Sequence, residues 1–590
     1  MFLATPISRG LQAVLLASTV HASALAQEAV TAVPSPELSA AVAPSFDILE
    51  FQVEGNSVLS VDAIERAVTP FLGERRTMVD AEGARVALEK AYQGAGFLTV
   101  FVDVPEQRVD AGVVILNVTE GRVERLKVSG SRYFSQGYIR AKVSELADGK
   151  VPNFNEVQRQ LALVNRTEER RVQPIMRAGM TPGTVETELK VDDKLPLAGS
   201  VDLSNRAAAG TAPLRLSASA RYENLFQLDH SLALTLATAP QDIAQSRVVS
   251  VNYTVPGADA SAWVGYVVHS DSAVAALGDV NVLGKGLTLG VRHVMPLTGA
   301  PEDVHSVSLG VDYKDLQEQT HAGSGAGASL ISTPLRYLPL EFGYSGAIDH
   351  GAQRKTLLSV QATVAFRRVL ARQLADCPGG SADQFACKRM GGDGGFATLR
   401  GEVRHALPIA FGLHPLGSLN LRFGAQLATG PVPSGEQFAI GGAESVRGYY
   451  EAEGAGDRAV LGSVEWRSPD FGAFITRGFG AVPDTALAFA TATSDAISAA
   501  AASTMTTALP PVSFLSQTHA LAFVDVARAY VFEPATGQAP HVSLAGAGIG
   551  LRSRFGKSVG GEFDLAWPFK ATAATPARSP RAHVKVALQF

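Results

Sequence analysis

The alternation of apolar and polar residues in the C-terminal part of the chain constrains the fold more than any other feature. From about Leu197 to Phe590, segments of about ten residues alternate in this way and are separated by turns or Gly-rich loops. The segments 358–367, 419–428 and 584–590 are clear examples. Side chains of a β-strand point alternately to opposite faces, so one face of each segment suits lipid and the other suits a wet lumen.

The composition narrows the interpretation of this pattern. The chain has 590 residues, of which 46% are hydrophobic and 18% are charged. Beyond the N-terminus we find no run of about 18 apolar residues that would cross a bilayer as a helix. The chain is therefore either a soluble β-rich protein or a transmembrane barrel, and a soluble sandwich commonly has shorter strands and a less uniform apolar face. We count about sixteen segments, an even number as bacterial barrels require, and predict a membrane β-barrel of about 16 antiparallel strands.

The N-terminus indicates export. Arg9 supplies a positive charge, residues 11–20 form a short apolar core, and Ala24-Leu25-Ala26 forms a cleavage site. We therefore predict a signal peptide over residues 1–26; an uncleaved membrane anchor would need a longer apolar core. Residues 27–45 contain several prolines and little periodicity, which is typical of a linker.

Two copies of one β-α-α-β-β pattern follow the linker, at residues 46–121 and 122–195. Leu126-Lys127-Val128-Ser129-Gly130 in the second copy mirrors Phe51-Gln52-Val53-Glu54-Gly55 in the first. In the first copy, Ser60 and Asp80 are the expected N-caps of the two helices. An internal repeat of this kind predicts two copies of one supersecondary unit, and the barrel then occupies residues 196–590.

Counting the strands gives each connection a side, because a chain that enters the barrel from the periplasm has its odd-numbered connections outside. Cys377 and Cys387 then lie on the fifth outer loop, where an oxidising compartment favours a disulfide that staples the loop. The Ala-rich stretch 481–511 lies on the inner side, and we expect a flexible periplasmic insertion there.

The sixth outer loop carries the segment Val446-Arg447-Gly448-Tyr449. With this segment, the repeat and the barrel, the whole mature chain resembles TpsB transporters. Three further stretches carry the same likeness: Leu203-Ser204-Asn205-Arg206, Arg221-Tyr222-Glu223-Asn224-Leu225 and Pro433-Ser434-Gly435-Glu436-Gln437-Phe438. TpsB transporters are the haemolysin-activator class of two-partner secretion pores, and the repeated units resemble their periplasmic POTRA domains.

The resemblance implies a function and a site. Members receive one unfolded, secreted TpsA-type partner, a β-helical adhesin or haemolysin, on their POTRA domains and move it to the cell surface without ATP (type Vb secretion). Their sixth loop folds into the barrel, where its arginine meets an acidic residue of the wall. In this sequence the arginine is Arg447 and the acid is Asp525, with Asp564 as the alternative. The family has a glycine two positions after the aspartate, where this chain has Ala527.

The resemblance also implies partners for assembly. Phe590 ends the last strand and is expected to act as the signal for the barrel-assembly machinery, which inserts such barrels into outer-membrane lipid. The family often has an N-terminal helix that plugs the pore, but three prolines break the segment 27–45. No nucleic-acid partner is expected, because the net charge is −5 and no basic cluster is dense enough.

Three rival interpretations remain. Gly556-Lys557-Ser558-Val559-Gly560 matches the G-x-S-x-G elbow of serine hydrolases, but it lies between two alternating segments and is expected to form a hairpin turn. With no nucleotide-binding loop and no metal motif, neither an enzyme nor a cofactor is predicted. A diffusion porin leaves the repeat and the sixth loop unexplained. The serious alternative is a POTRA-barrel assembly factor that inserts other outer-membrane proteins.

Overall fold

The computed structural model describes residues 45–590, apart from 473–514 and short gaps at 110, 258, 273, 278–279, 284, 298–302, 323–328, 376, 378–379, 381, 390, 413 and 536. The predicted signal peptide, nearly all of the linker and the Ala-rich insertion lie outside the described residues. Contacts divide the chain into two compact units, of which the first comprises residues up to Ala95 with Val100–Thr119, and the second comprises the remainder.

The first unit packs two helices against a three-stranded sheet of order β2-β5-β4. Its helix α2 begins at Met78 rather than at Asp80. Thr77 is the N-cap, and Asp80 stands at the third helical position, where its carboxylate accepts the Thr77 N–H at 2.8 Å. The expectation that Asp80 is the cap was therefore wrong by three residues, because the acidic half of a capping box was taken for the cap itself. The elements are β1 (Phe46–Ile48), β2 (Glu50–Glu54), α1 (Val61–Val68), β3 (Gly73–Arg76), α2 (Met78–Gly94), β4 (Val100–Asp103) and β5 (Val113–Glu120).

The small domain that opens the second unit has the same topology, with sheet order β6-β8-β7. One glycine shows how closely the two copies agree. Gly55 and Gly130 have φ angles of +87° and +82°, and a Cβ on either would lie 2.2–2.3 Å from the carbonyl oxygen of Val118 or Val191 on the paired strand. Only glycine fits such a position. The elements are β6 (Arg122–Ser129), α3 (Gln136–Lys142), α4 (Phe154–Val164), β7 (Arg170–Ala178) and β8 (Thr184–Asp193).

This small domain is joined by a buried ion pair to the turn at residues 226–229, between the second and third strands of the barrel. The side chain of Arg170 has no exposed surface, and its two Nη atoms each lie 3.0 Å from an oxygen of Asp229. The same guanidinium donates to the carbonyl of Val164 at 2.7 Å and lies 4.5 Å from the centre of the Phe134 ring. Burial and the nearby charge of Asp229 raise the pKa of Tyr138, on helix α3, to about 12.

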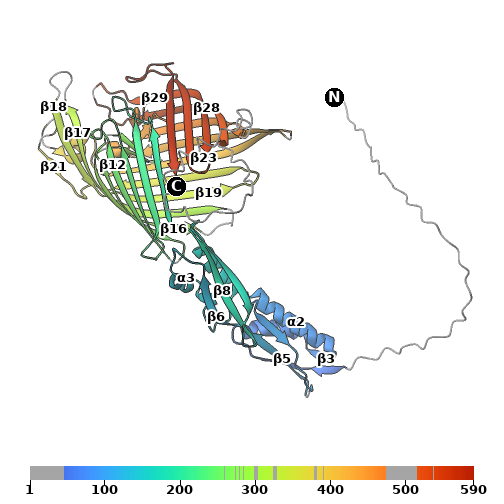
Figure 1. The fold of residues 1–590 in the computed structure, drawn as a ribbon. Helices are drawn as coiled ribbons and strands as arrows, with labels where there is room; N and C mark the ends of the chain where they lie inside the picture. Colours follow the sequence, from blue (N-terminus) through green and yellow to red (C-terminus); the bar gives the residue numbers. More distant parts are fainter. Residues whose placement is uncertain are drawn as a thin grey trace, which may run out of the picture. The chain divides into compact units, whose positions relative to one another are not determined.

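The remainder of the second unit is a closed antiparallel barrel (Figure 1). Strands β18 and β19 both pair with the long strand β17, β18 with its second half and β19 with its first half, so together they form one strand of the wall. The prediction of sixteen strands is thereby confirmed. The wall consists of β9 (Leu197–Ser204), β10 (Arg215–Leu225), β11 (His230–Thr238), β12 (Arg247–Pro256), β13 (Ala262–Ser270), β16 (Gly286–Leu297), β17 (Val304–Ala322), β18 (Ser329–Tyr337), β19 (Leu340–Asp349), β20 (Lys355–Ala365), β23 (Phe396–Phe411), β24 (His414–Ala428), β27 (Arg458–Arg467), β28 (Leu515–Tyr530), β29 (His541–Phe555), β30 (Val559–Pro568) and β31 (Arg581–Gln589).

The wall is apolar outside and polar inside. On β28, Val524 and Val526 are each 49% exposed, whereas Asp525 between them is 1% exposed and points inward. This arrangement inverts that of a soluble core and suits a barrel in lipid. Among the described residues, we find no helix that combines the length and the apolar character needed to span a bilayer.

The barrel closes between its first and last strands. Strand β31 pairs with β9 from Lys585 opposite Ser204 to Gln589 opposite Ser200. Phe590 then continues the ladder, because its backbone exchanges hydrogen bonds of 2.9 and 3.0 Å with Gly199. Closure pairs the edge strands, which lipid would otherwise leave unsatisfied.

Further short elements lie in the loops. They are β14 (Val274–Leu277), β15 (Val280–Leu283), β21 (Gln373–Leu374), β22 (Ala382–Asp383), α5 (Gln384–Lys388), β25 (Phe438–Ile440) and β26 (Gly454–Gly456), with 3₁₀ turns at Thr69–Phe71, Ser144–Leu146 and Ser434–Glu436. Cys377 and Cys387 form a disulfide in the loop between β20 and β23. Residues Gly556–Ser558 form the hairpin turn between β29 and β30, which is not the strand-to-helix turn of a hydrolase elbow.

Candidate functional site: the lumenal loop between β24 and β27

The loop between β24 and β27, here called loop six, covers residues 429–457 and folds against the inner face of the barrel. Its two arms pair as the short strands β25 and β26. Val446 and Tyr449, near the tip, have no exposed surface and belong to an apolar cluster with inward-facing residues of the wall. One of these is Ala527, which stands where the family pattern has glycine, so the methyl group packs beneath the loop.

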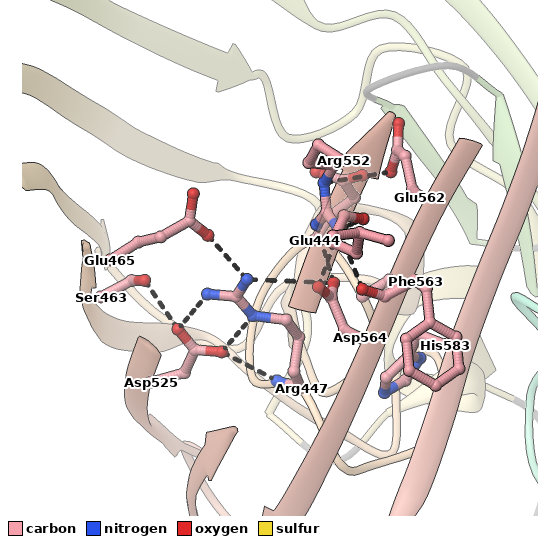
Figure 2. A network of polar contacts seen from close by, with 12 residues as sticks. Glu444, Arg447, Ser463, Glu465, Asp525, Arg552, Glu562, Phe563, Asp564 and His583 are labelled. Atoms are coloured by element: carbon pink, nitrogen blue, oxygen red, sulfur yellow. Dashed lines mark hydrogen bonds and ion pairs between the residues drawn. The ribbon is translucent and has the colours of Figure 1, made fainter. Parts of the chain in front are cut away.

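Arg447 lies at the tip of loop six, and the Nε–Nη2 edge of its guanidinium pairs with both oxygens of the Asp525 carboxylate (Figure 2). Its Nε lies 2.8 Å from Asp525 Oδ2 and its Nη2 lies 3.0 Å from Oδ1. The backbone N–H of Arg447 donates to the same carboxylate at 3.1 Å. The hydroxyl of Ser463 donates to Oδ1 at 2.6 Å. The planar fork of arginine matches a carboxylate in this way, whereas lysine would make a single contact.

A second acid also binds Arg447. Its Nη1 lies 2.8 Å from Glu465 Oε2 on strand β27, which the sequence analysis did not identify (Figure 2). Glu465 could have been found from the register of the wall, because Ser463 lies directly opposite Asp525 and Glu465 is the next inward residue of the same strand. The face of Phe523 completes the site, with its ring centre 3.3 Å from the guanidinium carbon.

The alternative acid, Asp564, has a different partner. It lies 3.9 Å from Arg447 Nη1, but its two oxygens accept hydrogen bonds of 2.7 and 2.8 Å from Arg552 on strand β29 (Figure 2). The structure therefore places Asp525 as the direct acceptor of Arg447 and places Asp564 in an adjacent pair.

Burial and charge act in opposite directions on Arg447. Burial tends to lower the pKa of its guanidinium, and the hydrogen bonds and charge of Asp525 outweigh that effect and raise the pKa. The arginine therefore stays protonated at any working pH. The side chains of Arg447 and Asp525 are only 8% and 1% exposed, although a cavity of about 430 Å³ borders the arginine, Glu465 and Asp564.

The residues beside the arginine fix the turn of the loop. Gly448 has a φ of +98°, a conformation that favours glycine, and its N–H donates to His583 Nε2 at 2.9 Å. The hydroxyl of Tyr449 lies within hydrogen-bond distance of the carbonyl oxygens of Ala545 and Lys570, at 3.0 and 2.9 Å, and can donate its hydrogen to either. The motif thus contacts β28, β29, β31 and the loop after β30 at once.

The first arm of loop six is anchored separately. Glu436 is 7% exposed, and its Oε1 accepts hydrogen bonds from Lys314 Nζ at 2.6 Å and from the Tyr337 hydroxyl at 2.8 Å. Loop six is therefore also held away from its tip, by wall residues that are distant in sequence. Across the described part of the chain, we find no group of three His, Cys, Asp or Glu residues that could hold a metal ion.

Residues 46–121 match the family model described as POTRA domain, ShlB-type, and residues 183–471 match the model described as haemolysin secretion/activation protein ShlB/FhaC/HecB. Together the two matches cover more than half of the chain.

Individual relatives agree with these models. The outer membrane transporter CdiB of Escherichia coli O6:K15:H31 is 25% identical over 196 residues, which is 33% of each chain. The CdiB transporter of Dickeya dadantii is 24% identical over 136 residues, or 23% of this chain and 24% of that one. The matched part thus spans about a third or less of the length of these curated relatives.

Solved structures share the fold. CdiB from Escherichia coli has a TM-score of 0.57 at 16% identity and covers 94% of this chain and 93% of that one. BamA from Haemophilus ducreyi, lacking POTRA domains 1–3, has a TM-score of 0.50 at 14% identity, with coverage of 92% and 100%. At these identities the likeness concerns architecture. The closed barrel and the POTRA match place the protein in the outer membrane with POTRA structure in the periplasm. The chain belongs to the ShlB/FhaC/HecB family of haemolysin secretion/activation proteins, the TpsB-type two-partner secretion transporters.

Proposed function

We propose that this protein is an outer-membrane pore that recognises one unfolded partner through its periplasmic POTRA domains and moves it to the cell surface without ATP. The observation that carries the proposal is loop six, which lies inside the closed barrel with the fork of Arg447 on Asp525. A loop held in the lumen by a few polar contacts can act as a latch that yields when a chain enters. The partner is a secreted, co-produced protein of the β-helical adhesin or haemolysin class.

The small domains offer a means of receiving an unfolded chain. In the sheet β2-β5-β4, strands β2 and β4 each pair on one side only, and β6 and β7 are the edges of the corresponding sheet in the second copy. An edge strand can accept a further strand through backbone hydrogen bonds, which do not depend on the sequence of the incoming chain. This mode of binding suits a receptor for a polypeptide that has not yet folded.

Depletion of the protein tests the proposal. We expect the loss of one large exported protein from the cell surface and medium, with normal levels of other outer-membrane barrels. The gene next to that of this chain should encode the long, repeat-rich protein that disappears. General failure of barrel assembly would contradict the proposal.

A second candidate function is the insertion of other outer-membrane proteins. The likeness to BamA, which covers 92% of this chain, favours it at the level of the fold. The same depletion separates the two functions, because an assembly factor would affect many barrels at once and a dedicated pore would affect one export.

A further inference from the structure

Asp457 ends loop six and lies in a second, fully buried polar site. Its carboxylate has no exposed surface and accepts five N–H groups. Two come from the guanidinium of Arg389, in a bidentate pair. The others are the backbone N–H of Val432 at 3.0 Å, that of Phe532 at 2.7 Å, and the side-chain amide of Gln437 at 3.4 Å. Asp457 thus binds both the start of loop six and the loop that follows β28.

Arg389 reaches this site from the loop between β20 and β23, which we call loop five. Its guanidinium also donates to the carbonyls of Val432 at 2.7 Å and Phe532 at 3.0 Å. Every contact of Arg389 named here therefore falls on Asp457 or on a residue that itself donates to Asp457. The side chain of Arg389 in loop five thus joins the two ends of loop six at Val432 and Asp457, which we call the neck of loop six.

Loop five is built to hold Arg389 in place. Helix α5 ends at Lys388, one residue before it, and contains Cys387 of the disulfide with Cys377. Phe385 of this helix is 7% exposed and lies edge-on to Tyr337, with ring centres 5.8 Å apart. Gln384 has no exposed surface and bonds to the backbone N–H and carbonyl of Arg336 at 2.9 and 2.8 Å. The helix is therefore tied to strand β18 on one side and to the disulfide on the other.

We propose that Arg389 is a positioning residue for loop six, and that the disulfide-stapled loop five clamps the neck of the latch independently of its tip. The effect of the clamp on export rests on the proposed function. The effect of Arg389 on the position of loop six does not. The neck clamp and the Arg447–Asp525 pair share no residue, so either can open while the other holds.

Two direct reporters of the clamp exist. The backbone amides of Val432 and Phe532 donate to Asp457, so opening of the site exposes both to solvent. We would measure hydrogen–deuterium exchange of the full-length protein in detergent for Arg389→Gln. The expected result is exchange about tenfold or more faster for peptides that contain these amides, because removal of one partner leaves a buried charge unpaired. Peptides across 444–449 should keep the wild-type rate.

Three further variants and one control separate positioning from general damage. Cys377→Ser combined with Cys387→Ser should accelerate the same amides, and Arg389→Lys should restore part of their protection because it keeps the charge but not the fork. Arg372→Gln, an exposed arginine of the same loop, is the matched control and should match wild type. A charge swap between Arg389 and Asp457 should fail, because Val432 and Phe532 still require an acceptor.

The result that overturns the inference is unchanged exchange at Val432 and Phe532 in Arg389→Gln. Exchange that rises throughout the barrel would also overturn it, because the residue would then be a general structural support. We also expect Arg389→Gln to alter export of the partner while the barrel remains heat-resistant in gels, and Arg389→Lys to rescue part of that export. If the neck opens and no single protein depends on this chain for export, the proposed function fails and the clamp stands.

Discussion

Replacing Arg447 with alanine removes the fork that joins the tip of loop six to the wall. The pair is nearly dry, with side-chain exposures of 8% and 1%, and the deletion leaves Asp525 with an uncompensated charge. Breaking a buried pair in this way costs ~3–5 kcal/mol. We adopt about 3 kcal/mol, the lower end, because the adjoining cavity gives solvent access to one side of the site.

That free energy applies to the equilibrium between the docked and undocked loop. At about 1.4 kcal/mol per factor of ten, about 3 kcal/mol shifts the ratio of docked to undocked loop by about 150-fold. The barrel itself should be unaffected, because the strand ladders make no use of the Arg447 side chain. We therefore expect a folded, heat-resistant barrel with a mobile loop tip and sharply reduced export.

The assay is hydrogen–deuterium exchange of peptides that contain residues 440–450, with peptides from 541–555 as the internal reference for the wall. Arg447→Lys should give an intermediate rate, because it retains the charge and loses the bidentate geometry. Arg354→Ala is the matched control, since this arginine lies in an exposed turn between β19 and β20. Wild-type exchange at the tip in Arg447→Ala would refute the argument, and normal export by that variant would refute the latch.

Three further predictions concern the same machinery. Asp525→Asn should release the loop tip about as strongly as Arg447→Ala, whereas Asp564→Asn should leave it docked, and the reverse order in the exchange assay would identify Asp564 as the true acceptor. Burial raises the pKa of Glu451, in loop six, above its usual 4.5, so the docked loop holds a proton on this carboxyl that the undocked loop has already lost. Loop six should therefore become more sensitive to protease as the pH rises above 4.5, and Glu451→Gln should abolish this dependence. Arg170→Gln should accelerate exchange in the turn that contains Asp229, by an amount that reflects ~3–5 kcal/mol for a broken buried pair, and unchanged exchange there would contradict the contact.

Much of the architecture could be predicted from local pattern. Strict alternation identifies wall strands, and their order from a periplasmic start assigns each connection to a side. Arg447 and the two cysteines were placed on their loops in this way. The helix starts were less certain, because Thr77 and Asp80 form one capping box and either could be taken for the cap.

The candidate site was only partly predictable, because it depends on contacts between distant segments. Asp525 was found through a family pattern, whereas Glu465 needed the register between β27 and β28, which alternation alone does not fix. Asp457 and Arg389 are separated by 68 residues and lie on two loops without periodicity. No local signal indicated that these two would meet, since only the closed barrel brings their loops together.

The buried fork of Arg447 has a consequence for affinity. If the incoming partner binds only when loop six is undocked, its apparent dissociation constant equals the intrinsic constant divided by the fraction of molecules in the open form. The pair's contribution of about 3 kcal/mol lowers the ratio of open to docked molecules by about 150-fold, so the resting pore binds its partner correspondingly more weakly than a pore without the pair would. Variants that loosen the tip should therefore bind the partner more tightly in solution. They should nevertheless export less of it, because a partner held tightly by the open form does not return loop six to the docked state in which the partner is released.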